Sequence, residues 1–232
     1  MIRQLILILL LGFVASAATA LEITARSWAV ADQKGNILQE FNSQQINSIA
    51  SITKLMTAMV VLDSQQDLNQ RLGSHTRRQL LQLSLIHSSN QAAETLCQSY
   101  PKGRSACLHA MNSKAQALNM HNTKFVDPTG LGIMNISSSQ DLIIMTLAAS
   151  NYSEIVLSSQ LFKTKIGRTI VYNTNHLVDK NYLVSKTGFI KASGGCIVMM
   201  LDTSVGRRIV VVLGSQNTRT RILEAEFISR LI

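Results

Sequence analysis

The chain has 232 residues, of which 46% are apolar, enough for one sizeable hydrophobic core. Its formal charge of +9, from 22 basic and 13 acidic residues, favours an acidic polymer as partner. Nucleic acid is discounted, because aromatic residues make up only 5% and no basic stripe is interleaved with them. The five histidines show neither i, i+4 pairs nor an H-E-x-x-H pattern, which argues against a metal site.

The first 20 residues predict an export signal. Arg3 supplies a basic start, residues 5–14 form an apolar core, and Ala18-Thr19-Ala20 offers a cleavage site of small residues. The apolar run is short for a membrane span, so cleavage is favoured over an uncleaved anchor. We therefore expect an exported protein with a single domain over residues 21–232. Membrane contact would occur only through the signal segment, if it stays uncleaved.

The next segments predict two strands and a buried helix. The strands are expected near Arg26–Asp32 and Ile37–Phe41, and the apolar run Ile52–Leu62 favours a helix buried on most faces. Ser51 would open this helix, where unpaired backbone N–H groups and the positive end of the helix dipole favour developing negative charge. Lys54, three residues on, shares a helix face with Ser51 and can reach its hydroxyl.

A serine followed three residues later by a lysine has two interpretations. The Ser51 hydroxyl becomes a nucleophile if a neighbouring base takes its proton, and Lys54 can serve if burial lowers the pKa of its amine. The alternative is a helix N-cap followed by a stray lysine. The same S-x-x-K pattern at Ser99–Lys102 has this second meaning, because Pro101 and Gly103 break the helix.

The middle of the chain predicts a helical lobe. Its helices are expected at Thr76–Ile86, Gln91–Tyr100, Ser105–Leu118 and Ser139–Ala149. The turn Ser88-Ser89-Asn90 separates the first two helices and could aim polar groups into a cleft. Ser88 could relay a proton to a leaving amine, and Asn90 could bind a substrate amide. The alternative is an ordinary helix N-cap, for which Ser and Asn are common.

The last third of the chain predicts the remaining strands, at Tyr182–Lys186, Gly195–Leu201 and Arg208–Gly214. Lys186-Thr187-Gly188 is expected at a sheet edge, where a fixed cation can hold a substrate carboxylate and Gly188 lets a substrate backbone approach. The N–H groups of Ser51 and Phe189 are the natural pair for an oxyanion hole. Thr218–Ile232 is amphipathic with mixed charges, so we expect it to pack on the sheet rather than on a membrane.

Three cysteines, an odd number, exclude complete intramolecular pairing. Cys97 and Cys107 flank a turn with Pro and Gly, and after export they could form a disulfide or remain free thiols. Cys196 lies in an apolar strand and is expected to be a buried thiol. None of the three is a candidate nucleophile.

Three short motifs occur in a fixed order along the chain. They are Ser51-Ile52-Thr53-Lys54, Ser88-Ser89-Asn90 and Lys186-Thr187-Gly188. Together they match the S-x-x-K, S-x-N and K-T-G set of serine acyl-transferases that react with penicillin. Each motif alone is weak evidence, and the ordered set carries the argument.

Longer stretches around these motifs resemble one family. Ala50–Ala58 resembles the nucleophile segment of the low-molecular-mass penicillin-binding proteins, the serine D-alanyl-D-alanine peptidases. Phe125–Leu131 resembles that family's loop of type F-x-N-P-x-G-L, with Asp127 at the Asn position. Asn173-Thr174-Asn175, followed by the K-T-G motif, most resembles the penicillin-binding protein 7-type D-alanyl-D-alanine endopeptidases. The similarity extends from about Ala25 to the C-terminus.

The resemblance implies a mixed α and β protein with the serine β-lactamase/DD-peptidase fold. In this fold an antiparallel sheet from both chain ends is flanked by helices, with an inserted helical lobe. The resemblance also implies a periplasmic enzyme in which Ser51 attacks D-alanyl peptide bonds of peptidoglycan, Lys54 is the general base and Ser88 relays a proton. Substrate binding would fall to Asn90, Lys186, Thr187 and Gly188. β-Lactams would acylate the serine, and no metal or organic cofactor is needed.

Three functions stay open. The first is a DD-endopeptidase that cuts cross-links, favoured by Asn173-Thr174-Asn175 and Phe189, or a DD-carboxypeptidase. The second is a low-turnover or inactive peptidoglycan-binding or regulatory homologue, because the connection from Lys54 to Ser88 is shorter than is usual in the family. The third, a β-lactamase, is disfavoured because no E-x-x-L-N-type segment lies between Ser88 and Lys186. Ser-Ser-Asn in place of the commoner Ser-Gly-Asn is a minor departure.

Overall fold

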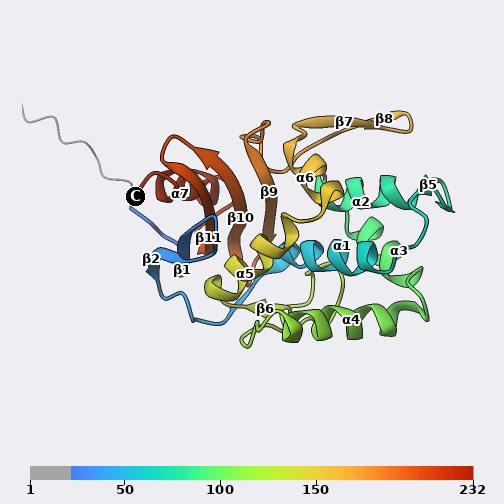
Figure 1. Cartoon of the computed structure of the whole chain (residues 1–232), viewed down its shortest axis with the longest axis horizontal. Coiled ribbons are helices and arrows are strands. Elements are labelled where there is room, and N and C mark those ends of the chain that lie inside the picture. The colour runs from blue at the N-terminus through green and yellow to red at the C-terminus, as the bar shows by residue number, and fades with distance from the viewer. Residues whose placement is uncertain (1–21, 232) are drawn as a thin grey trace, which may run out of the picture.

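The computed structural model describes residues 22–231, so the predicted export signal lies outside the described residues (Figure 1). A five-stranded antiparallel sheet takes its strands from both parts of the chain, in the order β2-β1-β11-β10-β9. Its strands are β1 (Ser27–Asp32), β2 (Ile37–Phe41), β9 (Tyr182–Ile190), β10 (Gly194–Thr203) and β11 (Gly206–Ser215). The predicted fold class is confirmed, and β9, with the K-T-G motif, forms one edge of the sheet.

The central strands are apolar because both faces of the sheet are covered. Alternate residues of β10 and β11 face opposite ways, so one set joins the core under the helical lobe and the other joins the core under α7 (Thr220–Ile228). In the second core, Ile197 and Val210 pack with Ile222 and Ile228. The predicted packing of the C-terminal segment on the sheet is therefore confirmed.

The helical lobe lies beside the sheet (Figure 1). Its helices are α1 (Thr53–Asp63), α2 (Arg77–Leu85), α3 (Asn90–Gln98), α4 (Gly103–Ala117), α5 (Ser139–Ala149) and α6 (Ser153–Gln160). α1 is the central helix, and nine of its eleven residues are buried, as its uniformly apolar sequence predicts. All the helices expected in the lobe are present, with their ends shifted by at most two residues.

Some elements were not predicted from the sequence. α6 is short and buries two serines beside Ile155, and the hairpin of β7 (Lys163–Ile166) and β8 (Thr169–Tyr172) is short and largely exposed, so they carry little hydrophobic periodicity. Two further pairings are shorter still: β3 (Asn47–Ser48) pairs with β6 (Ile136–Ser137), and β4 (Arg71–Leu72) pairs with β5 (His75–Thr76). There is also an isolated bridge between Lys124 and Ile136. β9 also runs past its predicted end, because β10 pairs with it as far as Ile190.

Between residues 22 and 231 no single helix has the length and hydrophobicity to cross a membrane, although the sharply bent α5–α6 pair would pass on length and composition together.

A disulfide joins α3 to α4. Of the two possibilities that the sequence left open, Cys97 and Cys107 are bonded to each other. Cys196 is a free thiol, buried as predicted, and burial raises its pKa. The cross-link closes a short loop and holds together two helices that both pack on α1.

Removing this disulfide should lower the free energy of unfolding by about 3 kcal/mol, the conformational entropy that a loop of this length loses in the unfolded chain. The measurement is urea denaturation of the double variant Cys97→Ser/Cys107→Ser against the oxidised parent. The parent with reductant should lose the same stability, whereas the variant should not respond to reductant. An unchanged denaturation midpoint in the double variant would contradict the structure.

Candidate active site

Ser51 lies where three chain segments meet. It sits in a 3₁₀ turn, Ala50–Ile52, that leads directly into α1, so it precedes the α-helix rather than opening it as predicted. The difference arises because Ala50 adopts a left-handed backbone conformation (φ +47°), which an α-helix cannot include. Ser51 still lies at the N-terminal, positive end of α1.

Two glycines allow this convergence. A Cβ atom on Gly130 would lie 1.8 Å from the carbonyl oxygen of Ala50, in a backbone conformation (φ +83°) that also favours glycine. A Cβ atom on Gly188 would lie 3.0 Å from the Ser51 nitrogen. Gly188 therefore brings the edge strand β9 against the nucleophile, and Gly130 does the same for the loop that precedes β6.

Lys54 is fully buried, and its amine has three oxygen neighbours. Nζ lies 2.8 Å from Ser51 Oγ, and donates to Asn90 Oδ1 at 2.7 Å and to the Thr129 carbonyl at 2.5 Å. Burial lowers the pKa of Lys54 to about 7, although the charge of Asp127 opposes this shift. A neutral amine has two N–H donors and one lone pair, which match two pure acceptors and one hydroxyl donor. The surroundings therefore suit a lysine that accepts the serine proton.

Asp127 holds the loop that supplies the Thr129 carbonyl. Its Oδ1 accepts hydrogen bonds from the backbone and hydroxyl of Thr129 and from Gly130 N–H, and its Oδ2 accepts from Gly132 N–H. Burial alone would raise the pKa of Asp127, but these hydrogen bonds outweigh it and lower the pKa below its usual value. The carboxylate is therefore a permanent negative charge near Lys54.

The three residues of the middle motif have different structural roles. Ser89 caps α3, since its hydroxyl accepts from Ala92 N–H, so the N-cap alternative applies to Ser89 alone. Ser88 is held in a left-handed conformation (φ +59°), and its Oγ lies 2.8 Å from Lys186 Nζ. Asn90 binds Lys54 through Oδ1. Strained backbone of this kind persists where the surroundings require it, which is typical of functional sites.

The K-T-G motif lines a cavity of about 180 Å³ beside Ser51. The residues that line the cavity are Ser51, Ser88, Thr174, Thr187, Gly188, Phe189, Thr218 and Arg221. Lys186 itself is buried beneath the cavity, where its Nζ meets Ser88 Oγ and the Thr187 carbonyl. Burial, together with the charges of Lys54 and Arg221, lowers the pKa of Lys186 well below its usual value.

Three residues of this cavity, Thr174, Thr218 and Arg221, were not predicted from the sequence. Arg221 of α7 is the cation that lines it, and its Nη1 donates to the Gly188 carbonyl at 2.6 Å. Burial lowers the pKa of Arg221 to about 10, so the guanidinium stays charged at neutral pH. Thr174 reaches the K-T-G motif through a 2.6 Å hydrogen bond between its Oγ1 and Thr187 Oγ1. The Asn173-Thr174-Asn175 resemblance pointed to Thr174, but no local motif marks Arg221.

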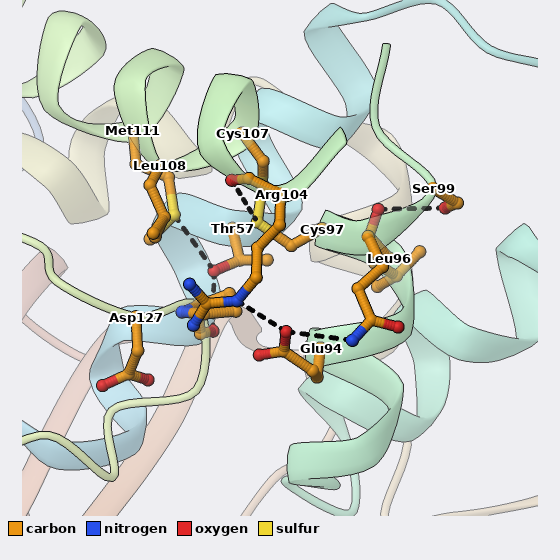
Figure 2. Close-up of a disulfide and its surroundings, with 12 residues drawn as sticks. Thr57, Glu94, Leu96, Cys97, Ser99, Arg104, Cys107, Leu108, Met111 and Asp127 are labelled. Atoms are coloured by element: carbon orange, nitrogen blue, oxygen red, sulfur yellow. Dashed lines mark hydrogen bonds and ion pairs between the residues drawn. A yellow bond between two sulfur atoms is a disulfide. The ribbon is translucent and has the colours of Figure 1, made fainter. Parts of the chain in front are cut away.

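The disulfide lies behind the same site (Figure 2). α4 carries Met111 one turn after Cys107, and Met111 Sδ lies 3.7 Å from Thr57 Oγ1 on α1. The same Thr57 hydroxyl donates to the Pro128 carbonyl at 2.8 Å, next to Thr129. The disulfide-linked helices, the nucleophile helix and the loop that holds Lys54 thus form one packed unit. Among residues 22–231, no three His, Cys, Asp or Glu side chains are grouped closely enough to hold a metal ion.

This geometry has counterparts among known proteins. The model of the Peptidase_S11 family, D-alanyl-D-alanine carboxypeptidase, matches residues 14–75 and 68–217. A D-alanyl-D-alanine endopeptidase of Pseudomonas aeruginosa is 38% identical, over 90% of this chain and 77% of its own. The enzyme of the same name from Escherichia coli is 36% identical, over 80% and 69%.

Solved structures show the same fold. Penicillin-binding protein D2 from Listeria monocytogenes, in its ampicillin-bound form, is 25% identical and superposes with a TM-score of 0.81, over 90% of this chain and 97% of its own. The Streptomyces K15 DD-transpeptidase is 24% identical with a TM-score of 0.82, over 90% and 96%. Its likeness shows the fold alone.

The relatives also support the shortened connection after Lys54. The alignment with the Pseudomonas protein has 243 positions, whereas 90% of 232 residues is about 209, so about 34 positions belong to the relative alone. For the Escherichia coli protein, 218 positions against about 186 residues leave about 32. The two family matches overlap at residues 68–75, between Lys54 and Ser88, which indicates that the missing segment falls there. Because the family model matches most of this chain, the chain belongs to the Peptidase_S11 family, D-alanyl-D-alanine carboxypeptidase.

Proposed function

We propose that this protein is a serine DD-peptidase that cuts D-alanyl peptide bonds of peptidoglycan through an acyl-enzyme on Ser51. Cross-links are its main substrate, and terminal D-alanine is a second one. The observation that carries the proposal is the buried Lys54 amine, 2.8 Å from Ser51 Oγ and bound to two further acceptors. The preference for cross-links is supported by the curated relatives, which are named D-alanyl-D-alanine endopeptidases.

Acylation begins when Lys54 takes the hydroxyl proton of Ser51 and Oγ bonds to the substrate carbonyl carbon. The backbone N–H groups of Ser51 and Phe189 stabilise the resulting oxyanion. As the C–N bond breaks, the proton held by Lys54 reaches the leaving amine by way of the Ser88 hydroxyl, which leaves Lys54 neutral again; Lys186 orients Ser88 from 2.8 Å. Water then attacks the ester with Lys54 as base, which releases the acid and restores Ser51.

Substrate binding follows from the charges around the cavity. None of the eight residues that line it is acidic, and Arg221 adds a buried positive charge, so the cavity suits a carboxylate on the leaving side of the scissile bond, such as that of a terminal D-alanine. Thr187 offers a hydroxyl to the same group. Asn90 accepts from Lys54 with Oδ1, so its Nδ2 can donate to the amide carbonyl on the acyl side of the substrate.

The substrate sets the location of the protein and its inhibitors. Peptidoglycan lies outside the cytoplasm, so the protein must be exported, in agreement with the signal predicted for residues 1–20. β-Lactams carry a strained amide that Ser51 can open, and a structural relative is known in an ampicillin-bound form. We therefore include β-lactams as covalent inhibitors of a periplasmic enzyme.

One observation favours a second function, a low-turnover or regulatory peptidoglycan-binding protein. About 30 aligned positions of the curated relatives have no counterpart in this chain, and the two family matches meet between Lys54 and Ser88. A cleft that lacks a flanking segment excludes less water and holds the substrate less firmly.

The test is digestion of cross-linked muropeptides and of a free pentapeptide by the mature protein, with Ser51→Ala as control. We expect monomers from the cross-linked material and a slower loss of terminal D-alanine. Labelling by a fluorescent penicillin without conversion of either substrate would support the low-turnover alternative. Rapid release of the label would instead indicate a β-lactamase.

Acylation should depend on pH through Lys54. Only the neutral amine accepts a proton, and the pKa of Lys54 is about 7. The second-order rate constant for penicillin acylation should therefore rise about tenfold per pH unit below pH 7 and level off above it. Stopped-flow or gel measurements from pH 5 to 9 would show this, and Lys54→Arg, which stays protonated, should abolish labelling. A flat profile would contradict the assignment of Lys54 as base.

Asp127→Asn should shift this profile to lower pH. The negative charge of Asp127 raises the pKa of Lys54, so its removal lets burial lower that pKa further. Asn occupies this position in the family loop that residues 125–131 resemble. Asp63→Asn, a change at the far end of α1, should leave the profile in place. If the two variants shift the profile equally, the effect does not come from the charge of Asp127.

A further inference from the structure

A second groove lies next to the hydrogen-bond partners of the catalytic lysine and shares no lining residue with the cavity that contains Arg221. It has a volume of about 430 Å³, and its lining consists of Asn90, Gln91, Glu94, Arg104, Asp127, Thr129 and Leu131. Asn90 and Thr129 are also the residues that accept hydrogen bonds from Lys54 Nζ. A substrate bound at Ser51 can therefore enter this groove without leaving the surface of the site.

The chemistry of the substrate indicates which of its parts would lie there. The cavity with Arg221 suits the carboxylate, and that carboxylate belongs to the leaving D-alanine. The acyl part must then extend from Ser51 in the other direction, past Asn90. The acyl part ends in the D-alanine that bonds to Ser51, so the groove is positioned for the residue that precedes this acyl D-alanine.

The charges of the groove favour an amine. It contains two carboxylates, Glu94 and Asp127, and one guanidinium, Arg104. Both hydrogen bonds that Glu94 accepts within residues 22–231, from Arg104 Nε and Gln98 Nε2, go to Oε1, so Oε2 remains available to a ligand. Leu131, with 60% of its surface exposed, provides an apolar wall for the methylene groups of a long side chain.

The charged pair is held on rigid elements. Glu94 lies three residues before Cys97 on α3, and Arg104 lies three residues before Cys107 on α4, so the disulfide holds both helices close to the pair. Figure 2 shows Arg104 reaching from α4 to Glu94, with Asp127 on the neighbouring loop. A binding group held in this way discriminates between ligands better than one on a mobile loop.

We propose that this groove binds the free side-chain amine of the residue that precedes the acyl D-alanine, and that Glu94 determines this specificity. The substrate class is a stem peptide with a diamino acid at that position, its side-chain amine unmodified. This inference rests on the proposed function, because it takes Ser51 as the point from which the acyl part extends.

The test compares two synthetic peptides, Nα-acetyl-lysyl-D-alanyl-D-alanine with its side-chain amine either free or acetylated. The active protein gives kcat/KM for both, and Ser51→Ala gives both dissociation constants by calorimetry. We expect kcat/KM and the binding affinity to be about fivefold higher for the peptide with the free amine, as one partly exposed ion pair would give. Glu94→Gln in each background should remove the preference, and Arg104→Gln should increase it.

Glu154→Gln is the matched control, since Glu154 also pairs with an arginine, Arg78, at 3.1 Å but lies outside the groove. It should keep the preference. Equal binding of the two peptides to Ser51→Ala, or an equal loss with both peptides in Glu94→Gln, would overturn the proposal. If the active protein hydrolyses neither peptide while Ser51→Ala still prefers the free amine, the proposed function fails and the groove assignment stands.

Discussion

The site depends on the burial of one amine, that of Lys54. A charged ammonium is costly to bury, so this position is stable only if the amine can become neutral and all its hydrogen bonds are made. Its partners come from the nucleophile turn, from α3 and from the loop before β6, segments far apart in the sequence. The lysine therefore acts as a reagent and also links the nucleophile turn, α3 and the loop before β6 to one another.

Close backbone contacts hold the segments around the nucleophile turn in fixed positions. Gly130 and Gly188 let two segments approach the nucleophile turn at distances that any side chain would prevent. Ala50 and Ser88, on either side of the cleft, are both held with positive φ. Conformations of this kind cost free energy locally and persist because the packed lobe requires them. The reactive groups are thus placed before substrate arrives, which is the basis of electrostatic catalysis.

Much of this arrangement could be predicted from local patterns. The apolar sequence of α1 predicted its burial, the alternating and apolar runs predicted the sheet, and the ordered motifs brought Ser51, Lys54 and Ser88 together. Other features depend on long-range contacts that no local pattern encodes. Arg221 meets the Gly188 carbonyl only because α7 packs across the sheet. Likewise, the β7–β8 hairpin lies largely on the surface, where a sequence carries little periodicity, and α6 buries serines that no apolar pattern marks.

One partner of Lys54 has a particular evolutionary consequence. The acceptor at position 129 is a main-chain carbonyl, which every amino acid possesses. Random substitution of the residue there leaves the acceptor itself in place, whereas replacement of Asn90 deletes one outright. Replacement of Thr129 would remove only its hydroxyl, which donates to Asp127, whereas a side chain on Gly130 would displace the loop that carries the carbonyl. The lysine site should therefore tolerate changes at Thr129 better than changes at Asn90, Asp127 or Gly130.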